Sequence, residues 1–157
     1  RGATLAAILI AALGLGACAN KPEGDVNANA SMAGAAAPGS AQDFVVNVGD
    51  RVFFETDSTE LTPQSRATLD KQSQWLTNYG QYAFTIEGHA DERGTREYNI
   101  ALGARRAAIV QDYMTSHGIA ANRMRTISYG KERPVATCDD ISCWSQNRRA
   151  VTVINGN

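Results

Sequence analysis

Residues 83–107 read AFTIEGHADERGTREYNIALGARRA, and this stretch decides the fold. Its first part, residues 83–87, alternates apolar and polar side chains, which predicts a strand. Its last part restarts at Gly94-Thr95 with apolar side chains at helical spacing, which predicts a helix ending near His117-Gly118. The most polar segment, residues 87–99, lies between strand and helix. Because such a turn exposes backbone donors and side chains that the core does not use, we expect the functional site there.

Arg106 lies on the apolar stripe of the predicted helix. The stripe comprises Leu102, Ala107, Val110 and Met114, with Tyr113 beside them. An unpaired buried charge is expensive, so the guanidinium must reach a partner or point into a cleft at the helix edge. Asp91 is the nearest loop carboxylate, and Asn99 extends the polar end of the stripe toward the loop. Taken alone, these residues fit a structural Asp91–Arg106 salt bridge as well as a ligand site.

The segments on either side supply the remaining elements. Residues 44–54 are β-branched and aromatic with a Gly-Asp turn inside, and predict one or two strands. Thr62-Pro63 provides an N-cap and a first-turn proline for a helix to about Tyr79-Gly80. Residues 124–129 and 150–154 predict two further strands. The order β, α, β, α, β, β predicts an α/β sandwich of the α+β type, with two main helices packed on one face of a small mixed β-sheet.

The composition limits the classes of function. A length of 157 residues suggests one domain with a tail. Lys plus Arg is 15 and Asp plus Glu is 16, so no basic excess exists to drive binding to nucleic acid. Hydrophobic residues at 43% and charged residues at 20% exclude wholesale disorder and a many-helix membrane protein.

The first residues resemble the signal of a bacterial lipoprotein. Residues 5–18 are an uninterrupted run of apolar and small side chains, too short to span a bilayer and typical of a secretory signal. The run ends in Leu15-Gly16-Ala17-Cys18, which resembles a lipobox. We therefore predict a signal peptide over residues 1–17 and a lipidated Cys18 as the mature amino terminus. The alternative is an ordinary cleavage site with an incidental cysteine. By the same resemblance, Ala19 favours sorting to the outer membrane.

Residues 18–43 predict a flexible tether behind the lipidated cysteine. Residues 19–42 contain no aromatic side chain and consist mainly of Ala, Gly, Ser, Asn and Pro. Such a segment buries too little apolar surface to offset the entropy of ordering. We therefore place the folded domain at residues 44–157.

Four motifs carry a resemblance to a known family. They are GHADERGT at 88–95, YNIALGARRA at 98–107, SYGKERP at 128–134 and NRRAV at 147–151. Together they resemble the OmpA-like carboxy-terminal domains, and among these the peptidoglycan-associated lipoproteins of the Tol-Pal system. The resemblance implies a lipid-anchored protein of the outer membrane with its domain in the periplasm. It also implies non-covalent binding of peptidoglycan, which links outer membrane and cell wall and supports envelope integrity and cell division.

The resemblance also implies a ligand and its residues. The ligand is the diaminopimelate of the stem peptide, held in that family by the residues that correspond to Asp91 and Arg106. The far end of diaminopimelate is a zwitterion, which calls for a carboxylate and a guanidinium. We expect the two side chains to pair in the empty site and to part around the ligand. The resemblance adds the main chain of Thr56, Asp57 and Ser58, and places Asn99 and Leu102 as lining or bracing residues. The implied protein partners are TolB, whose surface overlaps the same cleft, and other Tol proteins.

A peptidoglycan hydrolase using His89, Asp91 and Glu92 is the competing class. Glycan hydrolysis needs a spaced carboxylate pair, and amide hydrolysis needs a metal or an activated nucleophile. Neither arrangement is visible, so we predict a binding protein and not an enzyme, with no catalytic residue, metal site or cofactor. His89 and His117 are lone histidines, which are usually structural or at the surface.

Two further signals lie near the carboxyl end. Cys138 and Cys143 lack the additional ligands of a zinc site, and in an exported domain a disulfide between them is favoured. This pairing leaves Cys18 as the odd thiol, which lipidation uses. The run Asn147-Arg148-Arg149 fits either a basic contact patch or capping of the turn into the last strand.

Overall fold

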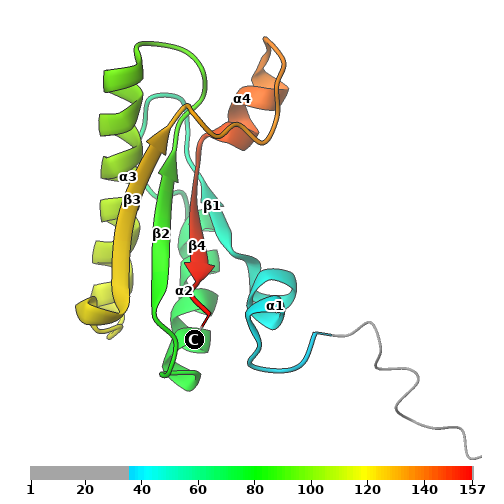
Figure 1. The fold of residues 1–157 in the computed structure, drawn as a ribbon, viewed down its shortest axis with the longest axis vertical. Helices are drawn as coiled ribbons and strands as arrows, with labels where there is room; N and C mark the ends of the chain where they lie inside the picture. The colour runs from blue at the N-terminus through cyan, green and yellow to red at the C-terminus, as the bar shows by residue number, and fades with distance from the viewer. Residues whose placement is uncertain (1–35, 157) are drawn as a thin grey trace, which may run out of the picture. The chain divides into compact units, whose positions relative to one another are not determined.

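The computed structural model describes residues 36–156, which contain a mixed four-stranded sheet (Figure 1). The strands are β1 (Arg51–Phe53), β2 (Phe84–His89), β3 (Met124–Gly130) and β4 (Arg149–Ile154), in the order β1-β4-β2-β3. Strand β4 is antiparallel to both neighbours, whereas β2 and β3 are parallel. The predicted signal peptide (1–17), Cys18 and the tether up to residue 35 lie outside the described residues.

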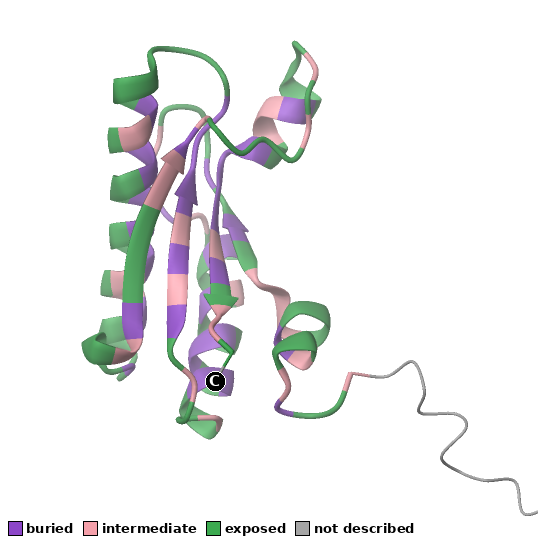
Figure 2. Ribbon diagram, viewed as in Figure 1, coloured by how far each residue is buried: buried purple, intermediate pink, exposed green. Residues whose placement is uncertain are grey.

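Two long helices, α2 (Pro63–Asn78) and α3 (Arg96–Ser116), pack on one face of the sheet. The predicted cap Thr62 begins α2, and Thr95, where the second helix was expected to start, caps α3: their side chains accept hydrogen bonds from the backbone N–H groups of Ser65 and Tyr98. The predicted fold class is confirmed. Figure 2 shows the buried residues along β2 and on the sides of the helices that face the sheet.

Helix α3 lies unusually close to β2. A Cβ atom placed on Gly88 would lie 1.8 Å from the carbonyl oxygen of Gly103, so neither position has room for a side chain. This contact fixes the position of α3 along the end of β2. It thereby brings the polar end of the α3 stripe next to the loop that follows His89.

The prediction of a strand at residues 44–48 is wrong. A helical turn, α1 (Ala41–Asp43), continues into a π-helical turn, η2 (Phe44–Gly49), which ends where Gly49 adopts a φ of 93°. Phe44 is buried and Val48 packs against the core, while Val45 and Val46 are exposed. An apolar pair spaced by four residues buries one side of a helix, and this packing outweighs the β propensity of the valines.

Residues 39–43, expected in the tether, contact the domain. The carbonyl oxygen of Gly39 accepts a hydrogen bond from the Tyr82 hydroxyl at 2.9 Å. Asp43 Oδ2 accepts one from Trp75 Nε1, also at 2.9 Å. The chain is therefore held before Phe44, because Trp75 on α2 and Tyr82 in the segment after it offer hydrogen-bond donors.

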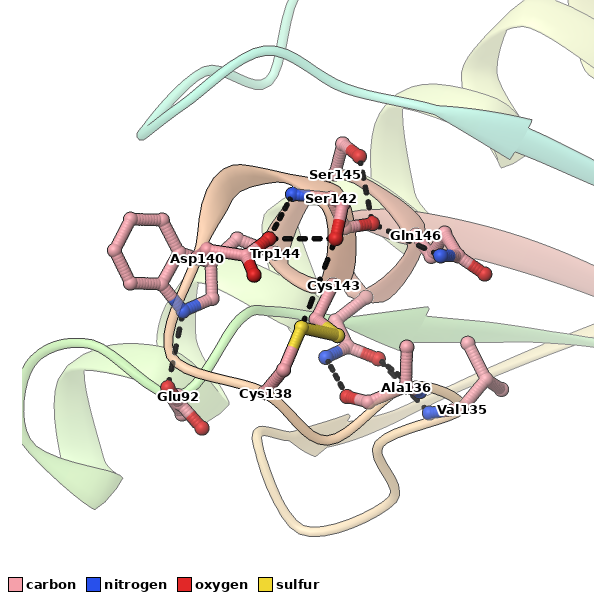
Figure 3. Close-up of a disulfide and its surroundings, with 11 residues drawn as sticks. Glu92, Val135, Ala136, Cys138, Asp140, Ser142, Cys143, Trp144, Ser145 and Gln146 are labelled. Atoms are coloured by element: carbon pink, nitrogen blue, oxygen red, sulfur yellow. Dashed lines mark hydrogen bonds between the residues drawn. A yellow bond between two sulfur atoms is a disulfide. The ribbon is translucent and has the colours of Figure 1, made fainter.

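A short helix, α4 (Ile141–Asn147), follows β3 and was not expected from the sequence. Asp140 caps its amino end, and a disulfide joins Cys138 to Cys143 with their Cα atoms 5.6 Å apart (Figure 3). The Asn147 side chain accepts hydrogen bonds from the backbone N–H groups of residues 135 and 136 and donates one back to the Ala136 carbonyl. Asn147 thus holds the loop at residues 135–136, before α4, and not the turn into β4 that the structural alternative named.

Candidate functional site

A pocket of about 240 Å³ lies beside the amino end of α3, where the loops after β1 and β2 meet. Its lining residues are Thr56, Asp57, Asp91, Arg93, Gly94, Tyr98, Asn99, Leu102 and Arg106. Six of the seven residues predicted for the ligand site therefore come together. Ser58 is outside the lining, and its carbonyl oxygen instead accepts a hydrogen bond from Arg106. Larger hollows near Ile109 and Phe53 do not contain this set of charged residues.

Arg106 is fully buried at the base of the pocket. Its Nε, Nη1 and Nη2 donate to the carbonyl oxygens of Ser58 (3.0 Å), His89 (2.8 Å) and Glu55 (3.2 Å). The guanidinium therefore ties the loop after β1 to the carboxyl end of β2. Burial and the nearby Arg148 charge lower the pKa of Arg106 to about 10, so it remains a cation at neutral pH.

Asp91 does not pair with Arg106, and the expectation of a salt bridge between them in the empty site is wrong. The Asp91 carboxylate instead accepts hydrogen bonds from Arg93 Nε (3.1 Å) and Nη2 (2.7 Å), and from Arg148 Nη1 (3.4 Å). Arg93 is two residues away on the same loop, whereas Arg106 donates to backbone carbonyls of other segments. Asp91 therefore pairs with Arg93, because the Arg106 guanidinium is oriented by its hydrogen bonds to those carbonyl oxygens.

The hydrogen bonds to Asp91 also set its protonation. Burial pushes the pKa of this carboxyl up, but the hydrogen bonds from the Arg93 side chain and backbone, together with Arg148, outweigh burial. The pKa of Asp91 consequently lies below its ordinary value. The pocket keeps an anion there at neutral pH.

The rim of the pocket is braced by hydrogen bonds from the first turn of α3 to each of the two loops. The Tyr98 hydroxyl on α3 donates to Asp57 Oδ1, and Asp57 has a φ of 58°. Asn99, which is buried, donates from Nδ2 to the Arg93 carbonyl oxygen at 2.8 Å. The site loop around Arg93 is therefore held from the first turn of α3.

Sequence reasoning missed Arg93, Tyr98 and Arg148 as members of this site. Arg93 had a visible signal, since it is a cation two residues from the predicted carboxylate. Arg148 belonged to the run considered as a basic contact patch, but nothing in the sequence joined it to Asp91, because the segment between α4 and β4 brings it there from the far end of the chain while its Nε donates to the Phe54 carbonyl oxygen. The lining carries two carboxylates, Asp57 and Asp91, and two guanidiniums, Arg93 and Arg106.

The residues that a hydrolase would use do not converge on the pocket. Of His89, Asp91 and Glu92, only Asp91 is a lining residue. Glu92 accepts a hydrogen bond from Trp144 Nε1, and His89 is buried with its Nε2 atom 3.5 Å from the Glu87 carboxylate. Within residues 36–156, no group of three or more His, Cys, Asp and Glu side chains could hold a metal ion. In the same part of the chain, no helix is long and apolar enough to cross a membrane.

Comparison with known families matches residues 53–148 to the OmpA family. The peptidoglycan-associated lipoprotein of Rhizobium meliloti (strain 1021) is 65% identical over 94% of this chain and 85% of its own. That of Mesorhizobium japonicum is 61% identical over 94% of this chain and 89% of its own.

Solved structures agree with these matches. The crystal structure of the peptidoglycan-associated lipoprotein from Burkholderia pseudomallei is 36% identical with a TM-score of 0.69, covering 74% of this chain and all of that one. The C-terminal domain of Helicobacter pylori MotB is 19% identical with a TM-score of 0.64, covering 69% of this chain and 85% of that one, and shows the fold alone. The fold and its pocket define an OmpA-like domain. Within that class, this chain belongs to the family of peptidoglycan-associated lipoproteins.

Proposed function

We propose that this protein is an outer-membrane lipoprotein that binds peptidoglycan non-covalently through the diaminopimelate of the stem peptide. The observation that carries the proposal is the pocket lined by two carboxylates and two guanidiniums around Leu102. The far end of diaminopimelate presents an ammonium and a carboxylate on one carbon. A pocket with fixed charges of both signs complements this zwitterion and offers an apolar contact for its methylene chain.

Asp91 and Arg106 have distinct roles in this proposal. Asp91, with its lowered pKa, binds the ligand ammonium. A guanidinium has five N–H groups, and Arg106 donates three of these bonds to carbonyl oxygens, so the rest remain for the ligand carboxylate. Thr56, Asp57, Asn99 and Leu102 line the pocket, and Ser58 acts indirectly by fixing Arg106. Binding occurs without catalysis, because the residues of a hydrolase do not gather here.

The membrane anchor in this proposal is Cys18, lipidated after removal of residues 1–17. Several acyl chains on one residue give stable anchoring, whereas a single chain is marginal. A tether behind Cys18 then lets the domain reach the cell wall from the outer membrane. Mass spectrometry of membrane-extracted protein should show the loss of residues 1–17 and added acyl mass, and a free Cys18 thiol would contradict the anchor.

We further propose that the domain works in the Tol-Pal system, in envelope integrity and cell division, and that TolB competes for the same cleft. The support is family membership together with the charged pocket at the junction of the site loops. Titration of TolB into protein saturated with the stem peptide should release the peptide. Simultaneous binding of both ligands would contradict a shared cleft.

The test of the ligand is calorimetric titration of a diaminopimelate stem peptide into wild type and Asp91→Asn. Loss of the charge should weaken binding about 10- to 150-fold, the equivalent of roughly 1.5 to 3 kcal/mol for a charge-assisted contact. Asp70→Asn is the matched control, because Asp70 lies on α2 and contacts Tyr113 and His117 outside the pocket. Unchanged affinity in a folded Asp91→Asn variant would show that the carboxylate is only structural.

A further inference from the structure

We propose that Arg93 determines the specificity of the pocket for the zwitterion of diaminopimelate over the lone ammonium of lysine. Without ligand Arg93 pairs with Asp91, and in the complex it joins Arg106 at the ligand carboxylate while the ligand ammonium binds Asp91. This inference rests on the proposed function and adds a residue and a mechanism of selection to it.

The first observation is that Arg93 is the accessible guanidinium of the pocket. Its side chain is 40% exposed, whereas Arg106 is fully buried and donates to three carbonyl oxygens. Arg93 binds both oxygens of Asp91, at 3.1 and 2.7 Å. A ligand ammonium needs the same two oxygens, so it cannot bind Asp91 fully without displacing Arg93.

The charges then favour an exchange of partners. A ligand that brings only an ammonium displaces Arg93 and leaves two cations, Arg93 and Arg148, near the newly bound one. A zwitterion also brings a carboxylate, which pairs with the displaced guanidinium. The single Arg93–Asp91 pair is then replaced by two ion pairs for diaminopimelate, but by only one for lysine, which leaves Arg93 without its anion. Such a penalty against the wrong ligand is a common source of specificity.

Trp144 provides the surface on which Arg93 can shift. The Arg93 Cζ atom lies 4.2 Å from the centroid of the Trp144 ring, in a cation–π contact. Trp144 Nε1 donates to Glu92 Oε1 at 3.0 Å, and α4 is held by the disulfide beside it (Figure 3). The guanidinium therefore keeps a fixed aromatic partner as it moves from Asp91 to the ligand.

The backbone of the loop stays in place during this exchange. The Lys131 ammonium donates to the carbonyl oxygens of Glu92 (3.1 Å) and Gly94 (2.7 Å), on either side of Arg93. Asn99 holds the Arg93 carbonyl oxygen itself. Only the Arg93 side chain is free to change partner, so the exchange needs no rearrangement of the loop.

The experiment compares stem peptides that carry diaminopimelate or lysine at the same position. Calorimetric titration of each into wild type, Arg93→Gln and Arg93→Lys gives the ratio of the two affinities. We expect Arg93→Gln to reduce this ratio about 10-fold, because it loses a charge-assisted contact with diaminopimelate and frees Asp91 for lysine. The ratio for Arg93→Lys should lie between those of wild type and Arg93→Gln, since an ammonium lacks the bidentate fork. Arg96→Gln is the control, because Arg96 is exposed and pairs with Glu132 outside the pocket.

The outcomes separate this inference from the proposed function. A wild type that prefers diaminopimelate, with the same preference in Arg93→Gln, would overturn the role of Arg93 alone. A wild type that binds neither peptide would overturn the proposed function and this inference with it. As a second variant, Trp144→Leu retains all charges of the pocket and should lower the ratio less than Arg93→Gln does; a larger fall in Trp144→Leu would also overturn the assignment to Arg93.

Discussion

The two ends of strand β2 are stabilised in different ways. Where β2 ends, at His89, buried arginines donate to backbone carbonyls: Arg106 to three of them, and Arg148 to that of Phe54. Where β2 begins, at Phe84, the neighbouring segment is held by aromatic rings. Trp75 there lies 5.0 Å from Phe44, 4.6 Å from Tyr79 and 5.5 Å from Tyr82, measured between ring centroids. In Figure 1 the two ends are marked by α4 and α1.

The difference teaches why a pocket lined by charges of both signs forms where β2 ends. The segments that follow β1 and end β2 have carbonyl oxygens that point into the protein. A buried carbonyl oxygen needs a hydrogen-bond donor. Arginine supplies several donors from one side chain, and its positive charge then lines the pocket that the loops enclose. At the aromatic end, Arg123 also donates to the carbonyl oxygens of Leu76, Tyr79 and Tyr82, but it is only half-buried, and burial of the aromatic rings supplies the rest of the stabilisation. Stability and ligand binding should therefore be coupled at the first end and separable at the second.

Arg106→Ala should have the largest effect, on stability and binding together. Removing a buried guanidinium leaves the carbonyl oxygens of Glu55, Ser58 and His89 without this donor, and we expect a loss of about 3 to 5 kcal/mol in the free energy of unfolding. The affinity for the stem peptide should fall together with the free energy of unfolding. Urea unfolding followed by circular dichroism measures the first effect and calorimetry the second. A loss below about 1 kcal/mol would show that water replaces the guanidinium easily.

Trp75→Ala should destabilise the domain without changing the pocket. A buried tryptophan replaced by alanine costs about 3 to 5 kcal/mol, because it leaves a cavity among Phe44, Tyr79 and Tyr82. Affinity for the stem peptide, measured well below the unfolding temperature, should stay within about twofold of wild type. Changes at sites distant from each other usually have independent effects. Reduced affinity in the folded variant would break the proposed separation of the two ends.

Acid should weaken the polar end through His89. Burial and the charges of Arg149, Arg133 and Arg51 lower the pKa of His89 to about 4, below its ordinary value of 6.5. The unfolded chain therefore binds more protons between these values, and stability is lost as the pH falls from about 6.5 to about 4, by roughly 2 to 3 kcal/mol in all. Urea unfolding across this range, in wild type and His89→Gln, measures it. Parallel curves for the two proteins would contradict the assignment to His89.

Opening the disulfide should have the smallest effect. The Cys138–Cys143 bond closes a short loop, and the chain-entropy model gives about 2 kcal/mol for such a loop. The double variant Cys138→Ser, Cys143→Ser should remain folded and lose only a few-fold in affinity, through a less firmly held Trp144. Labelling with a thiol reagent without reductant is the check, because two reactive thiols on the folded wild-type domain would contradict the bond.

Much of the fold was determined by local sequence. The two long helices could be predicted because Thr62-Pro63 and Thr95 are capping signals read within a few residues, and β2 because alternation is a property of consecutive side chains. The same applies to the site loop at residues 87–99 and to Arg106, whose place on an apolar stripe is set by helical spacing alone. These features depend on neighbours in the chain, so one sequence suffices for them.

The tertiary structure decided what depends on partners distant in the chain. Residues 44–49 are helical because Trp75 and the end of α2 offer a surface for Phe44, and this surface outweighs the β propensity of the valines. The partner of Asp91 was decided in the same way. Carbonyl oxygens of the loop after β1 and of the last residue of β2 orient Arg106, and the turn between α4 and β4 brings in Arg148, so the carboxylate pairs with Arg93 and Arg148. An ion pair forms between the groups that the fold leaves without better partners, and that competition cannot be evaluated before the segments meet.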